Sequence, residues 1–302
     1  MASAGGPRYD SGGRNWLAVG ALALAGSLWG TGFLFGKIAM SEMSVSENVS
    51  FRFIAGTLAL SPILLRRWEY RGRELRLILF ASLIGIPLQF LIQFKGLELT
   101  TVSHAALIIG TLPVMLAISS AAVLKERLEG LEWGGLGLSA AGALLIARSG
   151  AAGSSGPQPS MRGDLLVLLS LCAAVVMILC TKRLIATHNP LHVTATLISI
   201  GTIMLIVWAE LTEPLRFHFS GVAWGAAAAQ GLFATAGAYL CWNWGLSHMQ
   251  ASRAGVFLNL EPVVGALLGV IFLCEHLGPM ALLGGFFILS AAVYYTLRPH
   301  PA

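Results

Sequence analysis

The sequence predicts an all-α integral membrane protein in which ten transmembrane helices form two inverted repeats of five. Three observations lead to this prediction. The composition is too apolar for a water-soluble domain, apolar runs of about 20 residues recur along the chain, and the two halves resemble each other at a fixed offset. Helices of about that length cross the ~30 Å hydrocarbon core of a bilayer.

The composition excludes a soluble globule. Of the 302 residues, 56% are hydrophobic and 11% are charged, whereas soluble domains carry about 25% charged residues. There is too little polar surface here to face water on all sides. The bilayer is therefore the solvent that this chain requires.

The internal repeat is the most specific signal. Residues 96–143 match residues 245–292 without a gap, at an offset of 149 positions. A twofold repeat in an apolar chain is typical of transporters, in which the substrate site lies between the repeats. The identical pairs include Gly96 and Gly245, Leu97 and Leu246, Ser103 and Ser252, Pro113 and Pro262, Val114 and Val263, Leu124 and Leu273, Glu126 and Glu275, Leu128 and Leu277, and Gly135 and Gly284.

The apolar runs define the expected helices in order. We expect membrane spans at residues 16–37, 46–65, 76–94, 103–124, 130–148, 164–184, 193–210, 222–242, 253–273 and 278–297. The Gly-, Ser- and Pro-rich stretch between the fifth and sixth spans has the composition of a flexible linker. The chain thus divides into a tail (1–15), a first repeat (16–148), a linker (149–163), a second repeat (164–297) and a second tail (298–302).

An odd number of spans per repeat fixes the relation between the halves. The second repeat must begin on the opposite side of the membrane, so the repeats are inverted about an axis in the membrane plane. Lys and Arg are enriched in cytoplasmic segments, and a cytoplasmic N-terminus places thirteen of them inside and five outside. The inner set is Arg8, Arg14, Arg66, Arg67, Arg71, Arg73, Arg76, Lys125, Arg127, Lys182, Arg183, Arg253 and Arg298, and the outer set is Lys37, Lys95, Arg148, Arg162 and Arg216. Both tails are therefore expected in the cytoplasm and the linker outside.

Two prolines at equivalent repeat positions are candidate hinges. Pro113 and Pro262 fall about nine residues into spans 4 and 9, near the bilayer midplane. A proline inside a helix removes one backbone hydrogen bond and bends the helix, and transporters build binding sites at such breaks. A packing kink is the alternative.

Glu261, just before Pro262, is the carboxylate deepest within a span. A carboxylate at mid-helix costs roughly 2.5–3.5 kcal/mol on insertion, and the repeat partner is Leu112, so the fold itself does not require it. Proton coupling, contact with a substrate amine, and local pairing with backbone groups freed by the proline all remain open.

Amide and aromatic side chains are the candidates for lining the site. Gln89 and Gln93 lie four residues apart on one helical face, and Gln93 is the repeat partner of Trp242. Such side chains stack on rings and bind polar groups, although interhelical hydrogen bonds and interfacial aromatic belts are the alternatives. The residues expected to bind substrate are Trp29, Gln89, Gln93, Tyr239, Trp242, Asn243 and Asn259.

Other residues are candidates for gating. Gly30 and its neighbours allow span 1 to bend, and His104 and Arg253 occupy equivalent positions at the starts of spans 4 and 9, one near each mouth. Interfacial anchoring is the alternative for this pair. Arg52, about six residues into span 2, either snorkels toward the outer face or contacts an anionic group of the substrate.

Several function classes are excluded. The aspartates, Asp10 and Asp164, lie at or outside span ends, no Ser–His arrangement or metal-ligand spacing occurs, and no phosphate-binding Gly-rich loop with lysine is present. Membrane hydrolase chemistry requires such groups. The sequence therefore predicts no enzyme activity, no cofactor, no metal and no nucleic acid partner.

Short motifs resemble one family. Trp29-Gly30, the sequence LKERL at 124–128, LEPV at 260–263 and LCEHL at 273–277, in this order and spacing, are similar to EamA-type members of the drug/metabolite transporter superfamily, and within it to the YddG-type bacterial exporters of aromatic amino acids. The resemblance implies a multi-pass protein of the bacterial inner membrane that works by alternating access around a central cavity.

The expected function is export of small amphipathic metabolites, chiefly aromatic and other apolar amino acids, by a monomer or weak homo-oligomer in the lipid bilayer. A carrier of sugar phosphates or nucleotide sugars is disfavoured because Arg52 is the one basic residue well inside a span. A lipid-linked flippase is a further alternative.

Overall fold

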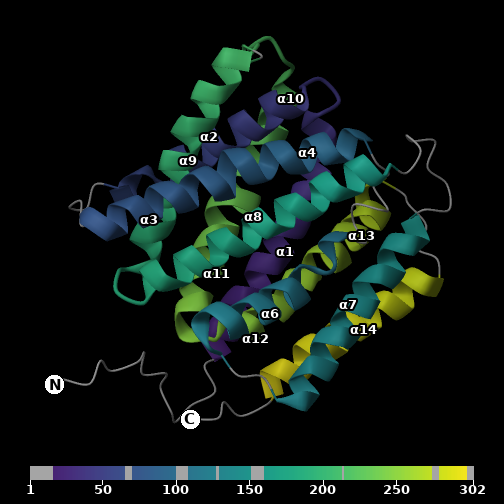
Figure 1. Cartoon of the computed structure of the whole chain (residues 1–302). Helices are drawn as coiled ribbons and strands as arrows, with labels where there is room; N and C mark the ends of the chain where they lie inside the picture. The colour runs from purple at the N-terminus through teal and green to yellow at the C-terminus, as the bar shows by residue number, and fades with distance from the viewer. Residues whose placement is uncertain are drawn as a thin grey trace.

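The computed structural model describes residues 16–64, 70–99, 108–126, 129–150, 160–212, 214–273 and 279–297. Within these ranges the chain consists of helices joined by turns and short non-helical connections, and it holds no strand. Figure 1 shows the helices packed side by side. Both tails, most of the linker, His104 and parts of the motifs at 124–128 and 273–277 lie outside the described residues.

The described helices follow the expected spans in order. The first half forms α1 (Trp16–Ala39), α2 (Val45–Leu64), α3 (Gly72–Leu83), the π-helix η1 (Ile84–Leu88), α4 (Gln89–Leu99), α6 (Leu112–Leu124) and α7 (Gly130–Gly150). The second half forms α8 (Met161–Ile185), α9 (Pro190–Thr212), α10 (Gly221–Gln230), the π-helix η2 (Gly231–Gly237), α11 (Ala238–His248), α12 (Ala251–Ala254), the 3-10 helix η3 (Gly255–Asn259), α13 (Leu260–Leu273) and α14 (Pro279–Leu297).

Four of the described helical stretches satisfy, each on its own, the length and apolarity needed to cross a membrane. They are Trp16–Ala39, Gly72–Gly96, Met161–Ile185 and Pro190–Thr212. The other helices are shorter, more polar or interrupted. Helical structure continues beyond the expected apolar limits at 76–94 and 222–242, because polar residues at helix ends are solvated without disturbing the backbone hydrogen bonds.

Polar residues define where several helices begin. Ser160 accepts a hydrogen bond from Gly163 N (3.3 Å) at the start of α8, and Ser220 accepts one from Ala223 N (3.2 Å) at the start of α10. At the start of α2, Ser44 and Glu47 each accept a backbone N–H from the other, which is the reciprocal capping box. These caps satisfy N–H groups that have no partner inside the helix.

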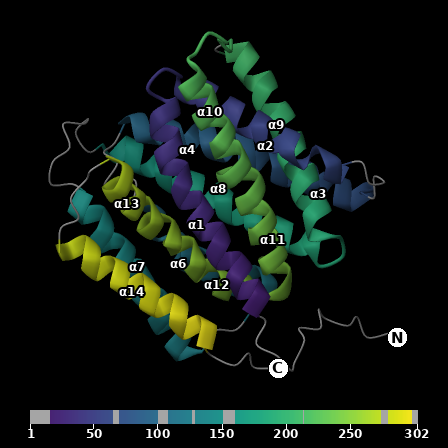
Figure 2. The ribbon, with the colours of Figure 1, turned by 180° about the vertical axis from the view of Figure 1, so that it is seen from behind.

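The two halves pack against each other in matched pairs. Helix α1 packs between α11 and α13 (Figure 2), and its counterpart α8 contacts α4 and α6. Helix α2 contacts η2 and α10, whereas α9 contacts η1 and α3. The counterparts α7 and α14 lie side by side at one edge of the molecule. Each half therefore completes the core of the other.

Close approach between α1 and α13 depends on glycines. A Cβ at Gly30 would lie 2.7 Å from Val264 Cβ and 2.8 Å from Glu261 O, and a Cβ at Gly26 would collide with the carbonyl oxygen of Phe257. Spacing of four residues between small side chains allows such contacts between membrane helices. This packing brings Trp29 and Glu261 to the same region of the molecule.

Candidate functional site

Two helices carry π turns at equivalent repeat positions. Segment η1 spans 84–88 and η2 spans 231–237, and the offset of 149 places 84–88 on 233–237. Single π turns inside α-helices are rare and are frequently found at functional sites. Segment η1 contains Gly85 and Pro87, and η2 (GLFATAG) is rich in small residues. The two π turns identify the region where the candidate site is built.

An aromatic cluster lies beside η2. The ring of Trp29 on α1 is 5.4 Å from that of Tyr239, nearly perpendicular to it, and 5.5 Å from that of Trp242. Trp242 and Tyr239 on α11 are 2% and 5% exposed, whereas Trp29 is half-buried. Edge-to-face rings at these separations attract each other beyond simple burial. Three of the expected substrate-binding residues thus lie together, with Trp29 the most accessible.

Arg52 points into the bundle and does not snorkel to the outer face, so that interpretation of the sequence is wrong. Its Nε donates to Thr235 Oγ1 at 2.8 Å and its guanidinium donates to Ala234 O at 3.3 Å, both in η2. The guanidinium carbon lies 5.4 Å from the Phe53 ring centre and 5.1 Å from that of Phe90. The residue is 8% exposed. Because the π turn presents polar atoms to the first half, the cation is stabilised inside.

Glu261 supplies the opposite charge. It lies in the first turn of α13, half-buried, where the helix dipole favours a negative group. It interacts electrostatically with Arg52 and with Tyr239, but no hydrogen bond or ion pair joins it to any residue in the described ranges. The carboxylate, the guanidinium and the aromatic cluster therefore share one region, contributed by both halves.

Each proline lies in the first turn of an α-helix. Pro113 occupies the first turn of α6, and Pro262 occupies the first turn of α13, after the 3-10 segment η3. Proline is tolerated there because the first-turn N–H has no helical partner. The regular α-helix is thus interrupted just before each proline, by the turn at Gly110 and Thr111 and by η3. Their role as hinges stays a prediction.

The amide side chains are distributed over several sites. Asn243 donates to Thr194 Oγ1 (2.8 Å) on α9, and Asn259 donates to Ser139 Oγ (2.9 Å) on α7. Both are buried and join helices. Gln89 and Gln93 are half-buried on α4, and Gln89 Oε1 has no hydrogen-bond donor among the described residues. No described contact brings these four side chains onto the aromatic cluster.

The expected gate residue Arg253 makes a buried ion pair. Its guanidinium lies 2.5 Å from Glu132 Oε1 on α7, and the two side chains are 7% and 2% exposed. Glu132 Oε2 also accepts the backbone N–H of Glu129 (2.8 Å) at the start of α7. The pair therefore ties α12 of the second half to α7 of the first.

Further contacts close the same end of the molecule. Helix α6 ends at Lys125 in the left-handed conformation (φ 57°), which turns the next residue, Glu126, toward α12. Its carboxylate accepts the N–H groups of Ala251 and Ser252 (2.9 Å each) and the Ser252 hydroxyl (2.8 Å). Lys182 Nζ donates to the carbonyl oxygens of Leu246 and Met249. This end is the one predicted to face the cytoplasm.

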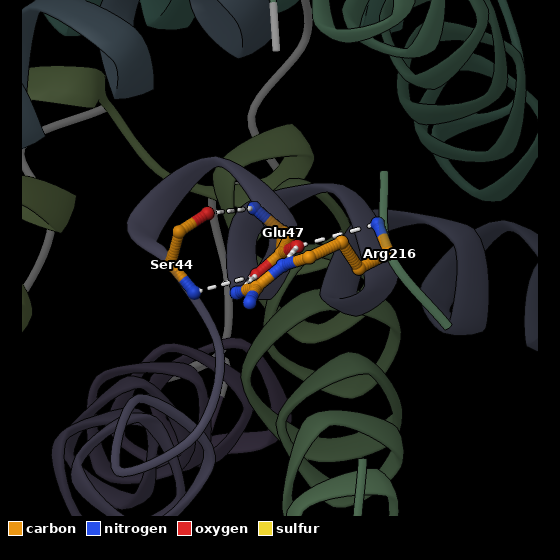
Figure 3. A network of polar contacts seen from close by, with 3 residues as sticks. All are labelled: Ser44, Glu47 and Arg216. Carbon is orange, nitrogen blue, oxygen red and sulfur yellow. Dashed lines mark hydrogen bonds and ion pairs between the residues drawn. The ribbon is translucent and has the colours of Figure 1, made fainter. Parts of the chain in front are cut away.

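A separate network lies at the other end of α1. Figure 3 shows Glu47 held between Ser44 and Arg216, with Arg216 Nε 2.7 Å from Oε1 and its terminal nitrogen 2.9 Å from Oε2. Nearby, Glu42 accepts the N–H and hydroxyl of Ser220 (2.8 and 2.6 Å), and these hydrogen bonds lower the pKa of the Glu42 carboxyl. Bidentate Arg–carboxylate pairs are geometrically specific. They join the α1–α2 loop to the segment before α10.

Within the described ranges, no three His, Cys, Asp or Glu side chains are placed to share a metal ion. The groups at the candidate site are one cation, one carboxylate and aromatic rings. This set recognises charge and apolar shape.

The EamA-like transporter family matches residues 16–148 and again 161–297. An uncharacterized transporter of Archaeoglobus fulgidus is 26% identical over 94% of this chain and 99% of its own, and another from the same organism is 30% identical over 92% and 85%. The "Probable terminal-alkyne amino-acid exporter" of Streptantibioticus cattleyicolor is 25% identical over 89% of each chain. One crystal structure shares the fold, with a TM-score of 0.77 over 91% of this chain at 18% identity.

Proposed function

The chain belongs to the EamA-like transporter family, and from this premise we propose that it exports aromatic and other apolar amino acids across the bacterial inner membrane. The family and the relatives named as transporters agree with a membrane protein that is not an enzyme. An amino acid is a zwitterion, and we infer this substrate class from the charged groups of the candidate site.

We infer that the helices form ten spans in two inverted repeats. The matched packing of α1 with α8 and of α2 with α9 supports this arrangement. So does a contact between repeat equivalents: Thr202 Oγ1 lies 3.4 Å from the carbonyl oxygen of Phe53, 149 positions away. Residues related by a twofold axis meet only where they lie beside that axis. The axis then passes between α2 and α9, next to Arg52, as expected for a transporter site between repeats.

The observation that carries the substrate class is that Arg52 and Glu261 carry opposite charges and interact electrostatically with each other and with Tyr239 of the aromatic cluster. A guanidinium has five N–H donors, and Arg52 uses two on Thr235 and Ala234. The remaining donors suit the two oxygens of an α-carboxylate. Glu261, in turn, suits an α-ammonium group. A zwitterion satisfies both charges at once, whereas a sugar phosphate would place its anion near the carboxylate.

The aromatic cluster suits the side chain of the same substrate. Trp29 is half-buried and backed by Tyr239 and Trp242, so an apolar or aromatic group stacks on it with little reorganisation. The amino-acid exporter of Streptantibioticus cattleyicolor is a relative whose name agrees with this class. Gln89, Gln93, Asn243 and Asn259 are further candidates for lining the cavity.

Alternating access requires two ends that open in turn. We propose that the contacts of Arg253 and Glu126 close the cytoplasmic end, that Pro113, Pro262 and Gly30 lie where the helices bend, and that His104 occupies the opposite mouth. Both termini then lie in the cytoplasm, as the distribution of Lys and Arg predicts.

The test is counterflow of labelled phenylalanine into liposomes that hold the purified protein. The competitors are phenylalanine, 3-phenylpropanoate, which lacks the amine, and phenethylamine, which lacks the carboxylate. Each analogue should compete ~10- to 150-fold less well, the loss of one charge-assisted hydrogen-bonded contact of 1.5–3 kcal/mol. Equal competition by phenethylamine would contradict the role of Arg52, and uptake of no amino acid would reject the substrate class.

Two variants sharpen this test. In Arg52→Gln, phenethylamine and phenylalanine should compete equally, and in Glu261→Gln, 3-phenylpropanoate should gain relative to phenylalanine. Arg162→Gln is the matched control, because Arg162 is exposed at the start of α8, far in sequence from the site. A change of analogue preference in the control would show that net charge, rather than the site, determines the outcome.

A further inference from the structure

A groove lies between α3 and α8 at the end of the molecule predicted to face the cytoplasm. It has a volume of about 570 Å³ and is lined by Arg73, Arg76 and Arg183, with Leu77 and Phe80 along one wall. It is formed where the start of α3 packs beside the end of α8. It shares no residue with the candidate transport site.

The α3 wall of the groove is amphipathic along its length. Residues 73, 76, 77 and 80 are spaced by three and four positions, so they lie on one helical face. At about 1.5 Å per residue, Phe80 lies roughly 10 Å along the helix from Arg73, in the direction of the bilayer interior. Phe80 is 48% exposed. The groove thus presents cations at the cytoplasmic surface and an aromatic ring deeper down.

The cations of the groove are available to a ligand. Arg73, Arg76 and Arg183 are exposed, and within the described ranges none of them makes a hydrogen bond or an ion pair. Glu74, the carboxylate in the lining, lies 3.4 Å from His188 Nε2. Three guanidinium groups against one carboxylate leave a net positive charge. Guanidinium groups bind phosphoryl oxygens in bidentate geometry.

We propose that this groove binds the headgroup of an anionic phospholipid of the cytoplasmic leaflet. The three arginines bind the phosphoryl oxygens, and Leu77 and Phe80 contact the glycerol and the first acyl carbons. Basic pockets beside membrane helices on the cytoplasmic side attract the negatively charged headgroups of such lipids. A soluble phosphate ester carries the same charge but has no acyl chain to contact Leu77 and Phe80. The apolar contact therefore distinguishes a phospholipid from a soluble phosphate ester as the ligand.

The experiment is native mass spectrometry of the full-length protein in detergent with three probes: dioleoyl phosphatidylglycerol, dioleoyl phosphatidylcholine and glycerol 1-phosphate. Phosphatidylglycerol should bind at least about fivefold more tightly than phosphatidylcholine, the contribution of roughly one interfacial arginine. Equal binding of the two lipids overturns the proposal. Binding of glycerol 1-phosphate as tight as that of phosphatidylglycerol overturns the lipid as the ligand.

The matched variants are Arg183→Gln and Arg162→Gln, which remove one exposed arginine from opposite ends of the same helix. Arg183→Gln should weaken phosphatidylglycerol binding about fivefold, while Arg162→Gln should leave it unchanged. Equal effects of the two variants would overturn the proposal, because the affinity for phosphatidylglycerol would then depend on the net charge of the protein rather than on the groove. Because the measurement involves no transport, its failure leaves the proposed transport function untouched.

Discussion

Replacing Glu132 by glutamine removes a carboxylate that pairs with the buried guanidinium of Arg253, and we expect this change to lower the melting temperature by about 5 °C or more. Both side chains are under a tenth exposed, with their nearest atoms 2.5 Å apart. Removing one partner of a buried ion pair costs about 3–5 kcal/mol because the other charge remains buried. With an unfolding entropy of about 2.1 cal/mol/K per residue, each kcal/mol lowers the melting temperature of this 302-residue chain by about 1.6 °C, so the lower bound gives about 5 °C.

The assay is thermal unfolding of the purified protein in detergent, followed by tryptophan fluorescence. Glu210→Gln is the control, since Glu210 is exposed on α9 and undergoes the same chemical change. Exposed substitutions of this kind change stability by no more than about 0.5 kcal/mol. If Glu132→Gln has the same melting temperature as Glu210→Gln, the argument from the buried pair is refuted.

A double variant separates the ion pair from the helix cap that Glu132 also provides. Replacing a buried pair by apolar residues of similar volume is often neutral or stabilising, so Glu132→Leu with Arg253→Met should recover most of the loss. If the double variant is as unstable as Glu132→Gln, the loss arises from the hydrogen bond to Glu129 N and not from the pair.

Three further outcomes are expected. Trp242→Ala should reduce transport while membrane expression stays normal, because it removes the buried wall of the aromatic cluster; unchanged counterflow would count against this placement. Gly30→Ala should destabilise the protein by about 1–3 kcal/mol, since its Cβ would lie 2.7 Å from Val264 Cβ, and a melting temperature equal to wild type would reject that packing. Hydrogen bonds from Ser220 lower the pKa of Glu42, so its contribution to stability is present above its ordinary value of 4.5 and is lost as pH falls through the lowered pKa. The melting difference between wild type and Glu42→Gln should therefore be constant near neutral pH and shrink on acidification, and a difference independent of pH would contradict the contact.

The order and limits of the helices could be predicted from sequence because membrane helices are encoded locally. An apolar run of sufficient length has few alternatives to a helix once it enters the bilayer. The expected spans at 46–65 and 130–148 thus differ from α2 and α7 by at most two residues at either end. The repeat offset also indicated which helices are counterparts.

The candidate site was less predictable because it depends on contacts between distant segments. Nothing near Arg52 in sequence indicates that Thr235 and Ala234 receive its guanidinium 183 and 182 positions later. Asn243 is an amide within an apolar helix, which is also the sequence pattern of a residue that lines a cavity. In the structure, however, its side chain donates a hydrogen bond to Thr194 on another helix. Glu126 lies four residues before the start of α7 in the sequence, yet the helix that it caps is α12 of the other half.

The paired π turns have a mechanical consequence. A π turn holds about one residue more than an α turn, and such a surplus residue is able to migrate along a helix without unfolding it. Each side chain that the surplus passes is rotated by roughly 100°, the angle per residue of an α-helix. Tyr239 follows η2 directly, and Trp242 lies one turn further on. A shift of η2 by a few positions would therefore turn these rings toward or away from Trp29 while both ends of the helix stay in place.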